Sequence, residues 1–319
     1  MWAATIIGVL VVFTLDFVVT HSPHEVSVRE AIGWTVCYLT LPVVFFGALW
    51  AGYGPGPATD FITGFLLEKS LSVDNLFVFM LLLTAFAVPA VLAQRVLLFG
   101  IVGALVLRGI FIAIGAAALA SLDFAFLLFG AILLFTAVKL VRDAVTGHET
   151  EVDIARMRSV RLLRRLLPVT DDYRGPRMMA REAGRRALTP LALVVTAVMA
   201  TDVIFAVDSI PAVYGVTGDP YLVFATNAFA LFGLRALYFV LQALLSRLVH
   251  LAYGLAVILG FIGVKLVLHW AHDLWPGVPD IPTTLSLLVI VVALGVVTVS
   301  SLLATRGVSG TEPESTTTE

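Results

Sequence analysis

The sequence carries one acidic pattern twice: EKSLSVDN at residues 68–75 and DVIFAVDS at residues 202–209. In each copy a carboxylate is followed six positions later by the Asp of a Val-Asp pair, and then by a small polar residue. Both copies lie inside long apolar runs, where a charged side chain costs about 2.5–3.5 kcal/mol on membrane-insertion scales. Charged residues at that depth indicate either ion pairing or a functional site.

The composition indicates a membrane protein. The 319 residues are 60% hydrophobic and 13% charged, and the mean hydropathy is +1.01, which excludes a soluble enzyme as the default class. The formal net charge of -2 gives no reason to expect nucleic-acid binding. Cys37 is the single cysteine, so neither an intrachain disulfide nor a thiolate metal cluster can form.

The apolar runs are long enough for several membrane crossings. We predict an all-α polytopic membrane protein with nine transmembrane helices, near residues 2–20, 31–51, 61–86, 96–118, 122–141, 189–214, 221–246, 249–270 and 284–304. The first run contains Asp16 and lacks the basic flank and the small-residue cleavage site of a signal peptide. We therefore predict that it is a retained span.

The distribution of basic residues predicts the orientation of the chain. Positive charge is retained preferentially on the cytoplasmic side of a membrane. The arginines of the loops and the tail all fall on one predicted side: Arg29, Arg95, Arg142, those from Arg156 to Arg186, Arg247 and Arg306. We predict a multi-pass protein of a bacterial cytoplasmic (inner) membrane, with its N-terminus outside and its C-terminus in the cytoplasm.

The chain divides into four predicted parts. These are membrane helices 1–5 in residues 1–142, a cytoplasmic basic amphipathic loop in 143–188, membrane helices 6–9 in 189–304, and a disordered cytoplasmic tail in 305–319. Arginines alternate with Ile, Met and Leu over residues 153–167. This pattern favours a helix that lies on anionic lipid headgroups, and a regulatory or partner-docking segment is the alternative.

The acidic pattern belongs to a longer internal repeat. Leu-Arg108 matches Leu-Arg235, and Ala-Val-Lys139-Leu-Val matches Gly-Val-Lys265-Leu-Val, in the same order. Each copy contains three predicted helices, helices 3–5 at residues 61–141 and helices 6–8 at residues 189–270. Because an odd number of crossings turns the second copy upside down, we predict two inverted three-helix repeats, as in many transporters. Chance similarity between apolar helices is the alternative.

We predict a cation site near the bilayer midplane, where the two copies meet. The polar run Ser70, Ser72 and Asn75 in the first copy and Pro211 in the second suggest that both acidic helices break there and free backbone carbonyls. Oxygen ligands suit hard cations such as Mn²⁺, Mg²⁺ or Ca²⁺, and carboxylates can also carry protons. The predicted ligands are Glu68, Asp74, Asn75, Asp202 and Asp208; the predicted charge partners are Arg108, Arg235, Lys139 and Lys265; the accessory candidates are Asp16, Ser209 and Asn227.

Pure ion pairing is the alternative for these acids. We expect the lysines, including Lys69, to extend toward the membrane interface instead, which leaves four acids against Arg108 and Arg235. The arginines would then orient the carboxylates and compete with a divalent ion. Two smaller groups have spacings that could hold a metal, although histidines are common at interfaces: His269, His272 and Asp273, and His21, His24 and Glu25.

Several motifs resemble the TerC family of integral membrane proteins. They are EKSLSVDNLFVF at residues 68–79, TDVIFAVDSIPA at 201–212, and Asn227 followed by GLRALY at 233–238. The likeness extends from residues 15–16 to the segment LPVTDDYRG at 167–175 and so covers nearly the whole chain. It implies a link to tellurium resistance and metal homeostasis, manganese export in several members, and an ion held by the five predicted ligands. Where family members often have Glu, three residues before Asp202, this chain has Met199 and one oxygen ligand fewer.

The leading hypothesis is a secondary transporter, not an enzyme. It would export a divalent cation such as Mn²⁺ by alternating access, with protons as counter-ion, and would hold no cofactor permanently. An intramembrane aspartyl protease that uses Asp74 and Asp208 is an alternative, although neither Asp lies in a Gly-x-Gly-Asp context. A scaffold that assists the insertion or metal loading of exported proteins is another, with membrane-protein partners or a homo-oligomer.

Overall fold

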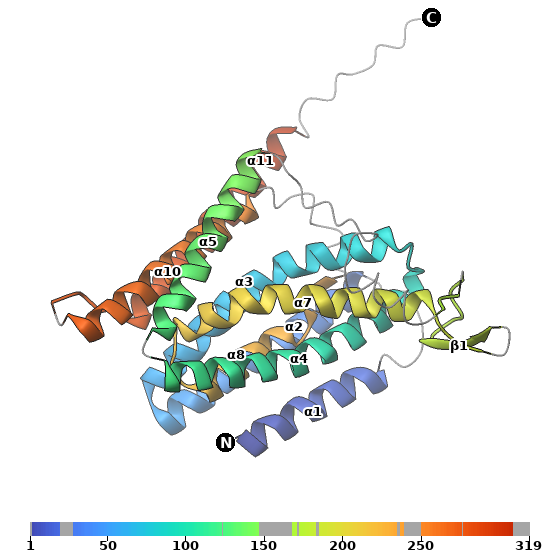
Figure 1. Ribbon diagram of the computed structural model, residues 1–319, viewed down its shortest axis with the longest axis horizontal. Helices are drawn as coiled ribbons and strands as arrows, with labels where there is room; N and C mark the ends of the chain where they lie inside the picture. The colour runs from blue at the N-terminus through green and yellow to red at the C-terminus, as the bar shows by residue number, and fades with distance from the viewer. Residues whose placement is uncertain are drawn as a thin grey trace, which may run out of the picture.

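The computed structural model describes residues 2–19, 28–122, 124–146, 168–170, 172–182, 185–234, 237–238, 250–275 and 277–308. These residues form long helices and one small antiparallel hairpin (Figure 1). The helices are α1 (Trp2–Val19), α2 (Val28–Tyr53), α3 (Pro55–Ala85), α4 (Ala90–Ser121), α5 (Ala125–Thr146), α7 (Pro190–Tyr214), α8 (Pro220–Leu231), α10 (Leu251–Leu274) and α11 (Thr283–Val308); the hairpin pairs β1 (Met179–Glu182) with β2 (Arg185–Leu188).

Helices long and apolar enough to cross a membrane dominate the described chain. By length and composition they are α2, α4, α5, α7, α10 and α11, so the protein is an all-α membrane protein. Each predicted apolar run overlaps a described helix, including α3, which carries Asp60, Glu68, Lys69 and Asp74. The count of nine spans and the orientation of the termini stay predictions. α8 ends at Leu231, and most of the predicted run beyond it lies outside the described residues.

The predicted breaks in the two acidic helices are wrong. α3 continues through the polar run at residues 70–75, and α7 contains Pro211 without ending at it. The Ser70 hydroxyl donates to the Leu67 carbonyl at 2.6 Å, so this side chain is satisfied within the helix. Pro211 lies in the last turn of α7, and the helix therefore ends soon after it instead of opening beside Asp208.

The helices of the two predicted sequence copies pack against each other. α3 packs on α8, α4 on α7 and α5 on α10; in Figure 1, α5, α10 and α11 lie together and are inclined to α3, α4 and α7. A Cβ on Gly130 of α5 would lie 2.9 Å from the Gly263 carbonyl oxygen of α10, and one on Gly263 would lie 3.1 Å from the Gly130 carbonyl oxygen. Only glycine permits two backbones to approach so closely.

The apolar core lies where α3, α4 and α7 meet. Leu76, Leu97 and Leu191 are fully buried there, and a second cluster joins α5, α7 and α10. The outward faces of the helices are also apolar, with Phe135 of α5 exposed by 73%. A helix that is hydrophobic all round is typical of a membrane span, because its outer face contacts lipid.

The loop between α5 and α7 is described only in its last part. The Leu188 backbone exchanges hydrogen bonds of 2.8 Å with Pro168 and Thr170, and the Tyr173 hydroxyl donates to the Phe86 carbonyl at 2.8 Å. Partial burial raises the pKa of Tyr173 above its usual value. Residues 153–167 lie outside the described residues, so their position on headgroups stays a prediction. α11 continues to Val308, past the predicted start of the tail at residue 305.

Candidate ion site

Arg108 of α4 is the centre of the buried polar cluster. Its side chain is fully buried and forms a two-pronged contact with Asp202 of α7. Nε donates to Asp202 Oδ2 at 3.1 Å, and Nη2 donates to Asp202 Oδ1 at 3.0 Å. This fork geometry satisfies both oxygens of the carboxylate and is the strongest form of arginine–carboxylate pairing.

The remaining guanidinium nitrogen of Arg108, Nη1, donates to three other side chains. Nη1 donates to Glu68 Oε1 of α3, to Asn227 Oδ1 of α8 at 2.8 Å, and to Ser209 Oγ of α7 at 3.4 Å. The orientation of the Asn227 amide is fixed because its Nδ2 donates to the Val223 carbonyl at 2.9 Å. The cluster therefore joins α3, α4, α7 and α8, which come from both sequence copies.

The charges of this cluster do not balance. Two carboxylates face one guanidinium, and the side chains of Glu68, Asp202 and Arg108 are at most 2% exposed. Glu68 Oε2 and Ser72 Oγ, one helical turn apart on α3, have no hydrogen-bond partner among the described residues. A buried carboxylate oxygen without a partner is costly, so this side of Glu68 favours the approach of a proton, a water molecule or a cation.

Asp208 lies outside the cluster although it belongs to the same helix and motif as Asp202. It is partly buried and accepts a hydrogen bond of 2.8 Å from Thr136 Oγ1 of α5. Lys139, exposed on α5, lies close enough to act on it electrostatically. On an uninterrupted helix, residues six apart point about 120° away from each other and are about 9 Å apart along the axis. The continuity of α7 therefore separates the two acids.

The sequence matches a known protein family. The model of the integral membrane protein TerC family matches residues 53–309. The chain belongs to the TerC family. The match includes every residue of the Arg108 cluster.

Relatives extend across nearly the whole chain. An uncharacterized membrane protein of Mycobacterium tuberculosis (strain CDC 1551 / Oshkosh) is 41% identical over 317 residues, which cover 96% of this chain and 80% of the relative. One of Myxococcus xanthus is 38% identical over 307 residues, which cover 96% and 93%. Alx of Escherichia coli (strain K12), whose description proposes a membrane-bound redox modulator, is 40% identical over 278 residues, which cover 84% and 85%. No solved structure matches the chain.

The five predicted ligands of this TerC protein are only partly brought together. Glu68 and Asp202 meet at Arg108, Asp208 lies at the α5 contact, and Asn75 is buried in α3. The Asp74 side chain lies outside what the structure describes, as do Asp16 and Arg235. Among the described residues no group of three or more His, Cys, Asp or Glu side chains could hold a metal as it stands. The full ligand set stays a prediction.

The two histidine groups also remain incomplete. His269 contacts the Asp280 carboxylate at 3.1 Å, and His272 contacts the Val278 carbonyl, so each ring is engaged with the turn between α10 and α11. The Asp273 side chain and residues 21, 24 and 25 lie outside the described part of the TerC chain. The predicted metal sites in these groups stay predictions.

Two lysines do not extend to the interface as the sequence suggests. Lys69 donates to the carbonyls of Ala230, in α8, and of Phe232, just after it. Lys265, only 7% exposed, donates to Ser286 Oγ of α11 at 3.2 Å. The central position of Lys69 in the 31-residue helix α3 is the signal that could have indicated an internal partner. Met199 packs against Gly103 of α4, whose added Cβ would lie 2.8 Å from the Met199 sulfur.

Proposed function

We propose that this TerC protein is a secondary transporter that exports a divalent cation, with Mn²⁺ as the first candidate, across the cytoplasmic membrane. One observation carries the proposal. Glu68 and Asp202, which occupy equivalent positions in the two sequence copies, meet at one buried guanidinium from α4. Ionisable residues inside a membrane bundle mark ion or proton pathways more often than structural sites.

The packing of the helices supports an inverted repeat. In the sequence, α3 corresponds to α7, α4 to α8, and α5 to α10. If the two copies are exchanged, the contact of α4 with α7 becomes the contact of α8 with α3, and both contacts are present. The third contact joins α5 to α10, its counterpart in the other copy. We infer that the copies are related by a pseudo-two-fold axis and that the Arg108 cluster lies near their interface, where transporters of this kind place their ion.

We infer that Arg108 competes with the transported ion. The guanidinium lies between the two carboxylates and leaves the cluster with one net negative charge. When Arg108 moves away, two negative charges become available to a divalent ion. Its return displaces the ion on the other side of the membrane. A proton on one carboxylate could replace the metal on the return step, which makes protons the counter-ion of this scheme.

The ligand chemistry of the cluster favours hard cations. The groups that Arg108 now contacts are carboxylate, amide and hydroxyl oxygens, from Glu68, Asp202, Asn227 and Ser209. Mn²⁺ and Mg²⁺ prefer such oxygens, whereas thiophilic metals prefer sulfur. The description of Alx proposes a redox modulator, and one form of redox activity is thiol–disulfide exchange. This chain cannot perform that exchange between its own residues, because Cys37 is its single cysteine.

Mn²⁺ flux into proteoliposomes tests the proposal. We expect Glu68→Gln and Asp202→Asn to reduce the flux more than tenfold, because both remove an oxygen charge on which the ion depends. Asp219→Asn is the matched control, since this Asp caps α8 outside the cluster. Asp74→Asn and Asp208→Asn extend the test to the remaining acids. Wild-type flux in both Glu68→Gln and Asp202→Asn, in variants with wild-type thermal stability, would rule out this site.

A further inference from the structure

α8 ends within the apolar part of the molecule, and the chain turns sharply there. Its last residue is Leu231, and Gly233 has a left-handed φ of +71°. A Cβ on Gly233 would lie 2.7 Å from the Cβ of Tyr38 on α2. Both the conformation and the contact therefore require glycine. The last carbonyls of a helix have no partner inside it, and an unsatisfied carbonyl is costly in hydrocarbon.

Lys69 of α3 supplies the donors for this helix end. Its Nζ donates to the Ala230 carbonyl at 3.0 Å and to the Phe232 carbonyl at 3.2 Å. These carbonyls lie on either side of the last residue of α8. Hydrogen bonds from a charged donor are stronger than those from a neutral one. The ammonium thus occupies the kind of position that a bound cation takes at the unwound helices of transporters.

The contact connects directly with the Arg108 cluster. On α3, Lys69 follows Glu68. On α8, Asn227 lies one turn before Ala230 and accepts a hydrogen bond of 2.8 Å from Arg108 Nη1. The position of the Asn227 amide relative to Arg108 therefore depends on how the end of α8 is held against α3.

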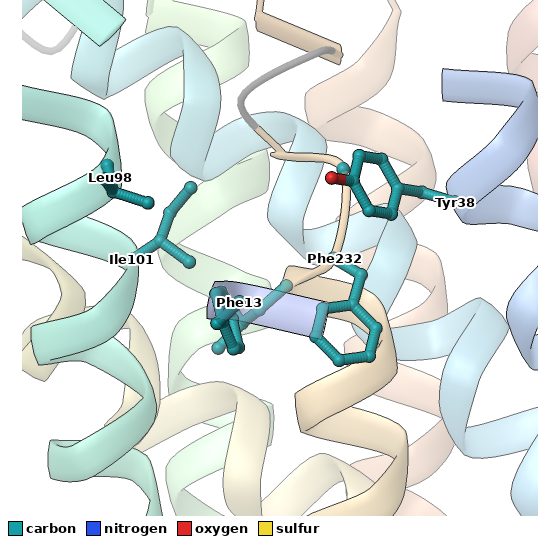
Figure 2. A pocket seen from close by; sticks show the side chains of 7 residues that line it. Phe13, Tyr38, Leu98, Ile101 and Phe232 are labelled. Carbon is teal, nitrogen blue, oxygen red and sulfur yellow. The ribbon is translucent and has the colours of Figure 1, made fainter. Parts of the chain in front are cut away.

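The described surroundings of the α8 end include few groups that could replace the lysine. The end of α8 borders a pocket lined by Phe13, Leu98, Ile101 and Tyr38 around Phe232 (Figure 2). The pocket has room for about one water molecule. Phe, Leu and Ile side chains cannot donate hydrogen bonds to carbonyl groups, so the Tyr38 hydroxyl is the one side-chain donor in this lining. Among the described residues, the surroundings left to the two carbonyls after loss of Lys69 would be mainly apolar.

We propose that Lys69 is a positioning residue: its ammonium holds the end of α8 against α3 and so keeps Asn227 within reach of Arg108. The functional part of this inference rests on the proposed transport, since Asn227 is one of the oxygen groups available to the cation. The structural part, the capping of α8 by Lys69, can be measured without any transport.

Hydrogen–deuterium exchange of the full chain in nanodiscs tests the capping. In Lys69→Met we expect the amides of residues 228–238 to exchange about ten- to a hundredfold faster, because two charged hydrogen bonds are lost. Lys69→Arg should restore most of the protection, since it keeps the charge. Lys265→Met, which removes a buried lysine between α10 and α11, should leave these amides unchanged. Unchanged exchange in Lys69→Met, or acceleration spread evenly over all helices, would overturn the inference.

Mn²⁺ transport kinetics test the positioning role. A misplaced Asn227 should raise the KM for Mn²⁺ in Lys69→Met while the maximal rate per folded molecule stays within about twofold, and Lys69→Arg should rescue the KM. A purely structural defect would lower only the total maximal rate, through a smaller folded fraction, and would leave the KM unchanged, which would contradict the positioning role. If the wild type carries no Mn²⁺, the proposed function fails, whereas the exchange result still decides the capping.

Discussion

Asp202 and Asp208 share one motif and one helix, yet they lie in two different regions of the molecule. Asp202 is sealed in the centre, with both oxygens bonded to Arg108. Asp208 lies at the partly buried contact with α5, where Thr136 is its donor. Because α7 is continuous between them, the two carboxylates cannot serve one point in space. In the proposed transport, an ion that uses both would therefore pass from one to the other, over about 9 Å along the helix axis.

The largest effect is expected from Arg108→Gln, which removes the partner of Asp202 and leaves the surroundings of Asp208 unchanged. The change leaves Glu68 and Asp202 as two buried negative charges with no cation between them. Removing one partner of a buried ion pair costs about 3–5 kcal/mol, and we expect the free energy of unfolding to fall by about that amount. Thermal unfolding in detergent measures the loss. The double variant Glu68→Gln/Arg108→Gln should recover part of it, and no recovery would show that charge repulsion is not the cause.

The sequence predicts which charged residues belong to the Arg108 cluster better than it predicts how they are arranged. Charged residues in apolar runs identified Glu68, Asp202 and Arg108 as groups that need partners, and the repeat indicated that the first two are equivalent. Which acid contacts Arg108 depends on the rotation of each helix about its axis. The predicted breaks at the serines and at Pro211 were wrong, so the sequence did not predict these rotations. Hydroxyls bond back to the preceding turn in apolar helices, so a polar run does not by itself interrupt them.

The actual end of a helix, near Gly233, was not foreseeable from composition. The chain contains 25 glycines, and only the contact of this one with Tyr38 and its left-handed conformation distinguish it. The central position of Lys69 in α3 indicates an internal partner, but not which one, because its partners are backbone carbonyls and leave no complementary side chain in the sequence. Tertiary contacts of the backbone are the part of the site that sequence reasoning could not reach.

A smaller but more specific effect is expected from a pair of variants, Glu68→Gln and Asp208→Asn. Glu68→Gln leaves Arg108 and Asp202 as a balanced pair, so the fold should persist while the maximal rate of Mn²⁺ transport falls more than tenfold. Asp208→Asn changes a carboxylate outside the Arg108 cluster and, in the proposed transport, should mainly raise the KM. Initial rates over a range of Mn²⁺ concentrations separate the two parameters. The same change of the same parameter in both variants would mean that the acids act at one point.

Asp208 lies at the contact with α5, and the position of α5 depends on how closely it approaches α10. Gly130→Ala would place a Cβ 2.9 Å from the Gly263 carbonyl oxygen, and such overpacking typically costs about 1–3 kcal/mol. Gly260→Ala on α10 is the matched control, because its Cβ would lie 3.7 Å from that of Ala137, an ordinary contact. Thermal unfolding should therefore show a clear loss for Gly130→Ala and almost none for Gly260→Ala. Equal losses would mean that the crossing is not limited by backbone contact.

The smallest effect is expected at Tyr173, which lies in neither region. Burial raises its pKa above the usual value of 10.0, so its contribution to stability is complete below pH 10 and is lost as the pH rises through the raised pKa. Tyr173→Phe removes the hydrogen bond to the Phe86 carbonyl and should reduce the alkaline loss of stability, which melting temperatures of both proteins against pH will measure. Mn²⁺ transport at neutral pH should be unchanged. A transport defect in Tyr173→Phe would require a coupling between this loop and the two acids of α7 for which the described contacts provide no path.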